Sequence, residues 1–162
     1  MASKLNTVAI YIVMMFIFMI ACDRIDIPEA IYDHPNQEAL ANILDDQLGK
    51  PYLWGAEGPD TFDCSGLVFY SYARMNMIVP RVSREQANFG LPVSCNQLEY
   101  GDLLFFNTTE KPSDRITHVG IYIGNEEFEQ ASSRKGEVVI TSTNTSFYQE
   151  RLKRCRRFLP QV

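Results

Sequence analysis

The stretch from Gly49 to Tyr72 constrains this chain more than any other. It reads GKPYLWGAEGPDTFDCSGLVFYSY, a loop rich in Gly and Pro that leads into Cys64 and then into apolar residues at helical spacing. Because no Gly or Pro interrupts that spacing after Gly66, Asp63 is predicted to cap a helix that begins at Cys64. A helix N-terminus stabilises a thiolate, so we expect the pKa of Cys64 to be lowered.

Cys64 has two interpretations. The simpler interpretation is that Cys64 is a small buried hydrophobic residue, as free cysteines usually are. The other is a nucleophile, which needs a base, usually a histidine, to take the thiol proton. Of the two histidines, His34 stands beside Pro35 in a segment expected to be exposed, whereas His118 lies in THVGIYIG, a strand pattern. His118 is therefore the candidate base, although a strand histidine alone is more often structural.

Gln130 is predicted to lie beside His118. A turn at residues 124–126 joins the strand of His118 to FEQAS, and the separation of twelve residues places both side chains on one face of an unbulged hairpin. The amide oxygen can then accept the Nδ1–H of the imidazole and leave Nε2 free for the thiol proton. A solvated strand glutamine is the alternative.

The first residues have the pattern of a secretion signal. One Lys4 precedes an apolar run from Val8 to Ala21, which is shorter than the roughly 20 residues of a membrane span. The run ends in MIAC and resembles the lipobox of bacterial lipoproteins, in which the peptide is cut before the cysteine and the cysteine is lipidated. Residues 1–21 are therefore predicted to be a signal peptide and Cys22 the lipidation site. Ordinary cleavage near Ala21 and an uncleaved anchor are the alternatives.

Residues 22–35 are predicted to be a tether, because they contain Pro28, Pro35 and several acidic residues. The rest of the chain, residues 36–162, suffices for one domain with its own core, and we expect a monomer. Removal of residues 1–21 takes away one lysine and no acid, which leaves 14 basic and 20 acidic residues and a net charge of −6. Such a balance provides no basic surface for nucleic acid.

Helical patterns come first in the domain and strand patterns follow. A capping box, SREQ, is expected to open the third helix at Ser83. Helices followed by strands predict an α+β fold with an antiparallel sheet. The helices are expected at 36–48, 64–77 and 83–90, and the strands at 103–107, 117–124, 128–132, 138–143 and 155–159.

Five motifs together carry a family resemblance. They are PYLWG, FDCSGLV, RVSREQ, GDLLFF and THVGIYIGN, in this order. The chain resembles the NlpC-type cell-wall peptidases, a papain-related family that hydrolyses peptidoglycan stem peptides. The resemblance covers about residues 36–159. It implies that residues 36–162 form a papain-like peptidase domain, with the nucleophile at a helix N-terminus packed on the antiparallel sheet.

The resemblance also implies roles for single residues. Cys64 corresponds to the nucleophile, His118 to the base and Gln130 to the third polar residue, which in relatives is most often a second histidine. We therefore expect a working site that is slower or has a shifted pH profile. Tyr52 corresponds to a tyrosine beside the nucleophile. The other positions expected to line the substrate groove are Trp54, Asp63, Ser65, Ser83 and Arg84.

The predicted function is that of a lipid-anchored cysteine endopeptidase that hydrolyses amide bonds in peptidoglycan stem peptides. Its expected location is the cell envelope of a bacterium, on the periplasmic side in a Gram-negative host. The alternative, suggested by the missing second histidine, is a catalytically weak or inactive lipoprotein that binds wall peptides or a partner through the same groove. Neither interpretation needs a cofactor.

The remaining cysteines and a basic run leave further questions open. The four cysteines include no CxxC pair, so no metal site is expected. Cys95 and Cys155 either form a disulfide or remain two buried thiols. The basic run from Arg151 to Arg157 is expected to be a solvated sheet edge, with contact to anionic lipid or wall polymer as the alternative.

Overall fold

The computed structural model describes residues 35–111 and 113–159. By its internal contacts the chain divides into Met1–Ala30 and Ile31–Val162, and all described residues belong to the second unit. The predicted signal peptide, the lipidation candidate Cys22, His34 and nearly all of the predicted tether lie outside the described residues. Within the described part, no helix is both long enough and apolar enough to cross a membrane.

An antiparallel six-stranded sheet forms the centre of the domain, with the strand order β1-β6-β2-β3-β4-β5. The four strands predicted before residue 145 are present within a few residues of their expected bounds. The fifth predicted strand begins three residues earlier than expected, and β1 was not predicted. The strands are β1 (Leu91–Val93), β2 (Leu103–Phe106), β3 (His118–Gly124), β4 (Glu127–Ser132), β5 (Glu137–Ser142) and β6 (Leu152–Arg157).

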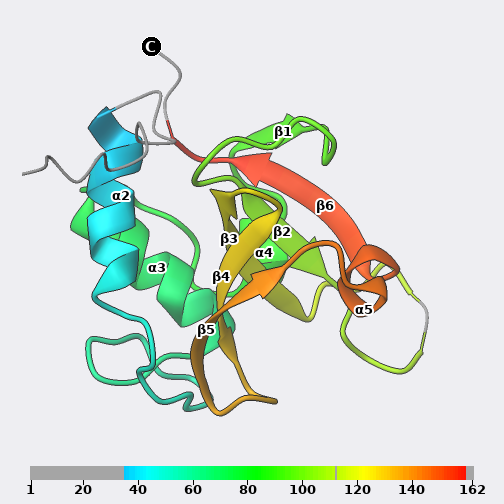
Figure 1. Cartoon of the computed structure of the whole chain (residues 1–162), viewed down its shortest axis with the longest axis horizontal. Coiled ribbons are helices and arrows are strands. Elements are labelled where there is room, and N and C mark those ends of the chain that lie inside the picture. The colour runs from blue at the N-terminus through cyan, green and yellow to red at the C-terminus, as the bar shows by residue number, and fades with distance from the viewer. Residues whose placement is uncertain (1–34, 112, 160–162) are drawn as a thin grey trace, which may run out of the picture. The chain divides into compact units, whose positions relative to one another are not determined.

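Two longer helices, α2 and α3, lie side by side and cover one face of the sheet (Figure 1). Helix α3 contacts β3 and β4 directly, so its N-terminus is held next to the start of β3. The helix-then-strand order and the antiparallel sheet confirm the predicted α+β class. The helices are α2 (Pro35–Asp45), α3 (Cys64–Arg74), α4 (Ser83–Gln86) and α5 (Ser146–Gln149).

Strand β2 is buried on both faces, because hydrophobic clusters lie on either side of it. On the helix side, Leu103 and Phe105 pack with Tyr72 of α3 and other residues of the main core. On the opposite side, Leu104 and Phe106 pack in a second cluster. Each fully buried side chain of this size contributes about 1.5–3 kcal/mol to folding. The start of β3, at the end of this strand pair, is therefore rigidly supported.

Strand β6 lies inside the sheet, between β1 and β2, so the predicted solvated edge is wrong. Its charged sequence, LKRCRR, hid the interior position because it lacks the apolar alternation of a buried strand. The arginines are used in internal contacts: Arg154 donates to Asn88, Arg156 to the Ala87 carbonyl and Arg157 to Asp102.

Cys95 and Cys155 form a disulfide, with their Cα atoms 5.5 Å apart. It ties the segment after β1 to β6 over a sequence separation of 60 residues. Closing a loop of that length stabilises the fold by about 4 kcal/mol in the chain-entropy model. Of the two alternatives for these cysteines, the structure therefore has the disulfide.

Candidate active site

Cys64 is the first residue of α3, as predicted. Asp63 adopts an extended backbone and its carboxylate accepts the Gly66 N–H at 2.6 Å, which makes it the N-cap. The helix start is packed tightly against the loop before it, because a Cβ on Gly66 would lie 2.0 Å from the Ala56 carbonyl oxygen. Glycine at this position thus allows the loop and the thiol-bearing turn to sit together.

The expected lowering of the Cys64 pKa is wrong: its pKa is raised to about 11. Burial is the main cause, and the negative charge of Asp63 adds to it. Backbone N–H groups of Val119, Ser65 and Cys64 itself act in the opposite direction without prevailing. The resting thiol is therefore protonated, and the contact with Val119 places it beside the start of β3.

His118 and Gln130 are brought together by the hairpin of β3 and β4. The His118 Nε2 and Gln130 Oε1 atoms are 2.6 Å apart. The expected nitrogen was Nδ1, so that detail is wrong, and Nδ1 is the ring atom left for the thiol proton. Burial lowers the pKa of His118 to about 4, against the opposing effect of the Gln130 hydrogen bond.

The amide of Gln130 is fully paired. Its Nε2 donates to Thr141 Oγ1 and to the Tyr148 hydroxyl, each at 2.8 Å, and its Oε1 lies 3.1 Å from the same hydroxyl. A rotated amide would lose these contacts, so the oxygen is held towards His118. Sequence reasoning missed both partners. Thr141 was detectable as a neighbour on the next predicted strand, whereas Tyr148 belongs to α5, a single turn with no apolar periodicity.

Tyr52 lies near the nucleophile. Burial raises the pKa of its hydroxyl, and the negative charges that a Cys64 thiolate and the Asp63 carboxylate carry raise it further, which shows that both groups are close. The hydroxyl therefore keeps its proton and can donate it. Trp54, two residues along the same loop, is 85% exposed and free to contact a ligand.

Asp63 and Ser65 are buried and paired with Arg81, for which no role was predicted. Arg81 donates to Asp63 Oδ2 at 2.8 Å and to Ser65 Oγ at 2.9 Å. Burial alone would raise the pKa of Asp63, but the hydrogen bonds and charge of Arg81, with those from Gly66 and Ser65, lower it. Arg81 was detectable as part of the RVSREQ motif.

The other two groove candidates, Ser83 and Arg84, belong to α4. The predicted capping box is absent: Val82 is the N-cap, without a side-chain hydrogen bond, and Ser83 is the first helical residue. The Arg84 side chain is exposed and Ser83 is half-buried. The site-facing contact of this segment comes from Gln86 instead, whose amide donates to the Ser65 carbonyl at 3.1 Å.

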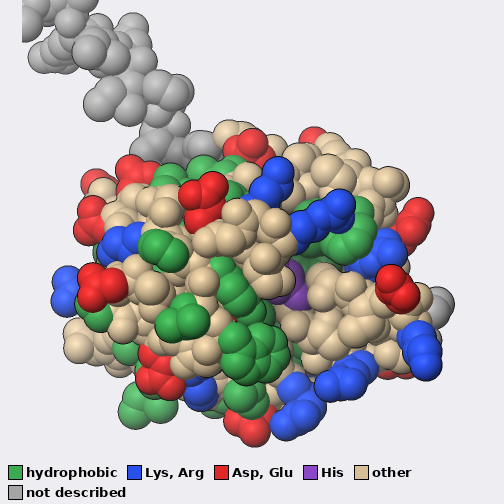
Figure 2. All heavy atoms as spheres, turned by 90° about the horizontal axis from the view of Figure 1, so that it is seen from below, with side chains coloured by type: hydrophobic (Ala, Val, Ile, Leu, Met, Phe, Trp, Pro, Cys, Tyr) green, Lys and Arg blue, Asp and Glu red, His purple; other side chains and the backbone are tan. Residues whose placement is uncertain are grey.

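The histidine is reachable from solvent. His118 is partly exposed and is the single histidine among the described residues. Figure 2 shows a histidine side chain in a recess of the molecular surface, next to hydrophobic side chains. Across the described residues, no group of three or more His, Cys, Asp or Glu side chains is arranged to hold a metal ion.

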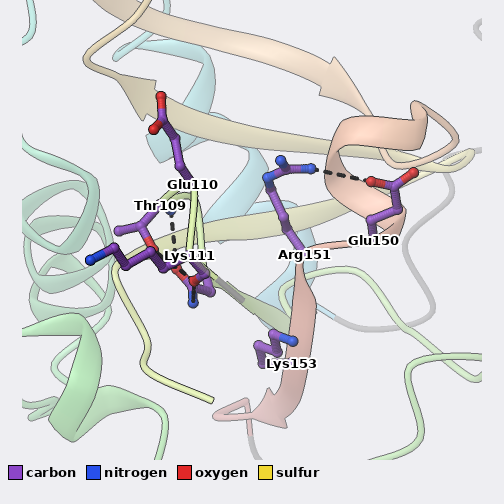
Figure 3. Close-up of a pocket in the computed structure, with 7 residues that line it drawn as sticks. Thr109, Glu110, Lys111, Glu150, Arg151 and Lys153 are labelled. Carbon is purple, nitrogen blue, oxygen red and sulfur yellow. Dashed lines mark hydrogen bonds and ion pairs between the residues drawn. The ribbon is translucent and has the colours of Figure 1, made fainter. Parts of the chain in front are cut away.

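A pocket of about 240 Å³ lies between the segment after β2 and the start of β6. Figure 3 shows that its lysines, Lys111 and Lys153, point in different directions, while Arg151 turns to Glu150. Arg151 also stacks on Phe147, 4.2 Å from the ring centre. Because its cations do not converge, the pocket adds no support for binding of an anionic polymer, which stays a prediction.

Together, these features define the class of protein: a papain-like α+β domain with a cysteine at a helix N-terminus, next to the strand that begins with a histidine. The chain belongs to the NlpC/P60 family, whose model matches residues 49–157.

Named relatives agree with this assignment. The chain is 38% identical to "Murein DD-endopeptidase MepH" of Escherichia coli, over 73% of this chain and 44% of that protein. It is 33% identical to "Probable endopeptidase" of Haemophilus influenzae, over 87% of this chain and 91% of that protein. The present chain thus spans less than half the length of MepH. An NlpC/P60 family protein of Bacillus cereus has a similar crystal structure, with a TM-score of 0.73 and 32% identity over 78% of this chain and 41% of that one.

Proposed function

We propose that this protein is a cysteine endopeptidase that hydrolyses amide bonds in peptidoglycan stem peptides. The observation that carries the proposal is the His118–Gln130 hydrogen bond on the strand that contacts the helix of Cys64. Support for the substrate class comes from the relative named as a murein endopeptidase.

In the proposed mechanism, both partners are neutral at rest. The raised pKa of Cys64, about 11, and the lowered pKa of His118, about 4, keep the thiol and the imidazole uncharged between those values. His118 Nδ1 takes the thiol proton as the sulfur attacks the scissile carbonyl, so the ion pair forms only during the reaction. Gln130 keeps the ring oriented through Nε2.

The later steps use the same groups, with His118 acting first as an acid and then as a base. The imidazolium of His118 protonates the leaving amine, and a water molecule then releases the acyl group with the imidazole as base. The developing oxyanion needs hydrogen-bond donors. The backbone N–H of Cys64 and the protonated Tyr52 hydroxyl are the proposed sources, because both lie beside the sulfur.

Substrate contacts are proposed for the residues around this centre. Trp54 offers an exposed aromatic surface beside the cysteine loop. Tyr52, Asp63, Ser65, Ser83 and Arg84 remain proposed groove positions, and for the two buried ones, Asp63 and Ser65, the Arg81 pairing supports a positioning role. The exposed Arg84 is proposed to act from the rim.

We also propose that the protein acts in the cell envelope of a bacterium, anchored by a lipid on Cys22 after removal of residues 1–21, with residues 22–35 as tether and 36–162 as peptidase domain. The lipobox-like sequence supports the anchor. The Cys95–Cys155 disulfide supports an oxidising compartment.

Digestion of purified sacculi tests the function, with the products identified by mass. The wild-type protein is expected to release cleaved stem peptides, and Cys64→Ala is expected to release none, because it removes the one free thiol among the described residues. Thermal unfolding of the variant within a few degrees of wild type is the control for folding. Equal product release by Cys64→Ala would contradict the proposed mechanism.

The same experiment distinguishes the alternative of a binding protein. If neither protein releases products while both bind sacculi equally, the groove holds wall peptides without cutting them. The uncharged Gln130 in place of a second histidine is the feature that would then account for the loss.

A further inference from the structure

Glu129, on β4, is an acidic side chain in an apolar setting. It is 2% exposed and its Oε1 atom has no hydrogen-bond partner among the described residues. Its strand neighbours Ile121 and Ile140 flank it across the sheet. A buried carboxyl oxygen without a partner is costly, so native proteins rarely keep one without a reason.

This carboxyl lines a pocket of about 250 Å³ between α2 and the sheet. Apolar residues from both layers form part of the walls, including Leu44 of α2 and Ile123 of β3. Polar groups stand around them: Asp45 and Asn42 on α2, and Glu127 at the start of β4. None of the described residues that line it is Lys, Arg or His.

We propose that this pocket binds an alkylammonium group, such as the end of a lysine or diamino-acid side chain. The nitrogen would donate to Glu129 Oε1, the carboxylate of Asp45 would add attraction at the rim, and the methylene chain would lie against Leu44 and Ile123. The site is separate from Cys64, so this proposal does not depend on the proposed function.

The chemistry of the pocket selects among cations. A divalent metal ion needs several converging oxygen ligands. Among the described residues, no group of three or more acidic, His or Cys side chains is arranged in that way, and this includes the acids of the pocket. An ammonium group has three N–H donors, which can be shared between the buried carboxyl and the polar groups at the rim, and its chain tolerates apolar walls. The volume of about 250 Å³ leaves room for a chain of that kind.

Binding should be coupled to pH through Glu129. Burial, with a smaller contribution from the charge of Asp45, raises the pKa of its carboxyl to about 8. The other titratable groups that line the pocket are Glu127 and Tyr100. Because the ammonium group pairs with the ionised carboxyl, affinity should rise about tenfold per pH unit up to that pKa and then level off.

The test is a titration of the full-length protein with n-butylammonium chloride at pH 8.5 and low salt, followed by amide NMR shifts. Saturable shifts are expected around residues 41–45 and 123–129, with n-butanol as the uncharged control. Absence of saturable shifts in these segments would overturn the proposal, as would equal binding of n-butanol.

Variants locate the binding. Glu129→Gln should weaken affinity about tenfold or more, because it removes a charge-assisted hydrogen bond. Asp45→Asn should weaken it about two- to fivefold, as an exposed rim charge does, and it keeps the test valid if the buried variant does not fold. Asp46→Asn, its exposed neighbour outside the pocket, should bind like wild type, and a loss equal to that of Asp45→Asn would contradict the assignment.

Two sources of the group can then be compared. One arm uses Nα-acetyl-lysine amide, which represents a protein side chain. The other uses a stem tripeptide that ends in a diamino acid with a free side-chain amine, which represents the cell wall. Tighter Glu129-dependent binding of one over the other identifies the source, whereas Glu129-independent binding of both would overturn the site.

Discussion

Glu129 and Gln130 are consecutive residues of β4 and each is 2% exposed. They differ in the hydrogen bonding of their polar groups. The amide of Gln130 is paired at every atom, with His118, Thr141 and Tyr148 around it. The carboxyl of Glu129, on the other face of the strand, keeps an oxygen without a partner in the described residues.

The difference matches the two proposed roles, positioning for Gln130 and binding for Glu129. Saturated hydrogen bonds fix one geometry, which suits a group that must hold an imidazole in place. An unsatisfied buried acceptor has free energy to gain from a ligand. Because strand side chains alternate between faces, one short strand can serve both purposes. Three predictions test this contrast.

The largest effect on catalysis is expected for Gln130→Leu, which removes the hydrogen bond between Gln130 and the His118 imidazole. Without it the ring can rotate, so kcat should fall about tenfold to a hundredfold with little change in KM, as for other losses in acid–base catalysis. Steady-state kinetics on a synthetic stem peptide would measure it. Gln130→His, which restores a hydrogen-bonding ring, is the matched control and should retain most activity. Unaltered kcat in the leucine variant would show that orientation by Gln130 is dispensable.

A pH-dependent effect on stability, rather than on catalysis, is expected for Glu129→Gln. In the folded protein the Glu129 pKa is raised from 4.5 to about 8, so the native state holds its proton more tightly than the unfolded chain does. Wild-type stability should therefore fall as pH rises from about 4.5 to 8, a loss that glutamine avoids. By pH 8.5 the free energy of unfolding of the variant should exceed that of wild type by on the order of 2 to 4 kcal/mol.

Urea unfolding at pH 5 and pH 8.5 would measure this gain. Glu38→Gln, an exposed acid on α2, is a control that should show no such trend. A pH-independent difference between Glu129→Gln and wild type would mean that the carboxyl is satisfied in solution.

The smallest effect is expected for Tyr148→Phe, which removes one hydroxyl from Gln130 and leaves Thr141 in place. Loss of one such hydrogen bond corresponds to about 1 kcal/mol, or roughly a fivefold fall in kcat. The pH profile should keep its shape, since the ring of Phe still packs against Phe106 and Phe128. The side-chain amide NMR signal of Gln130 should broaden. A sharp signal with lower kcat would place the role of Tyr148 elsewhere.

Much of the fold followed from local patterns in the sequence. The capped helix at Cys64 and the hairpin that carries His118 were predictable because each depends on neighbouring residues. The pairing of β6 between β1 and β2 was not, since sheet order depends on contacts between distant segments and β6 lacks alternation. Strand β1 was hidden by its length of three residues and by Pro92.

At the candidate site, the contact between His118 and Gln130 was predictable, whereas the pKa shifts were not. The even spacing of His118 and Gln130 sufficed to bring them together, but not to choose between the ring nitrogens, which depends on the rotamer. The predicted direction of the Cys64 pKa shift was wrong, because the sequence indicated the helix N-terminus but not the burial of the thiol. Arg81 was visible as part of the RVSREQ motif, but its pairing with Asp63 was not, since eighteen residues separate them.

The protonated resting state of Cys64 has a consequence for the durability of the protein. Oxidants and disulfides react with thiolates, and their reaction slows as the thiolate fraction falls. With a pKa of about 11, the sulfur is almost entirely in the unreactive form at neutral pH, while Cys95 and Cys155 are already joined. In the proposed oxidising compartment, this low thiolate fraction is expected to slow the formation of sulfenic acid and mixed disulfides at the proposed nucleophile.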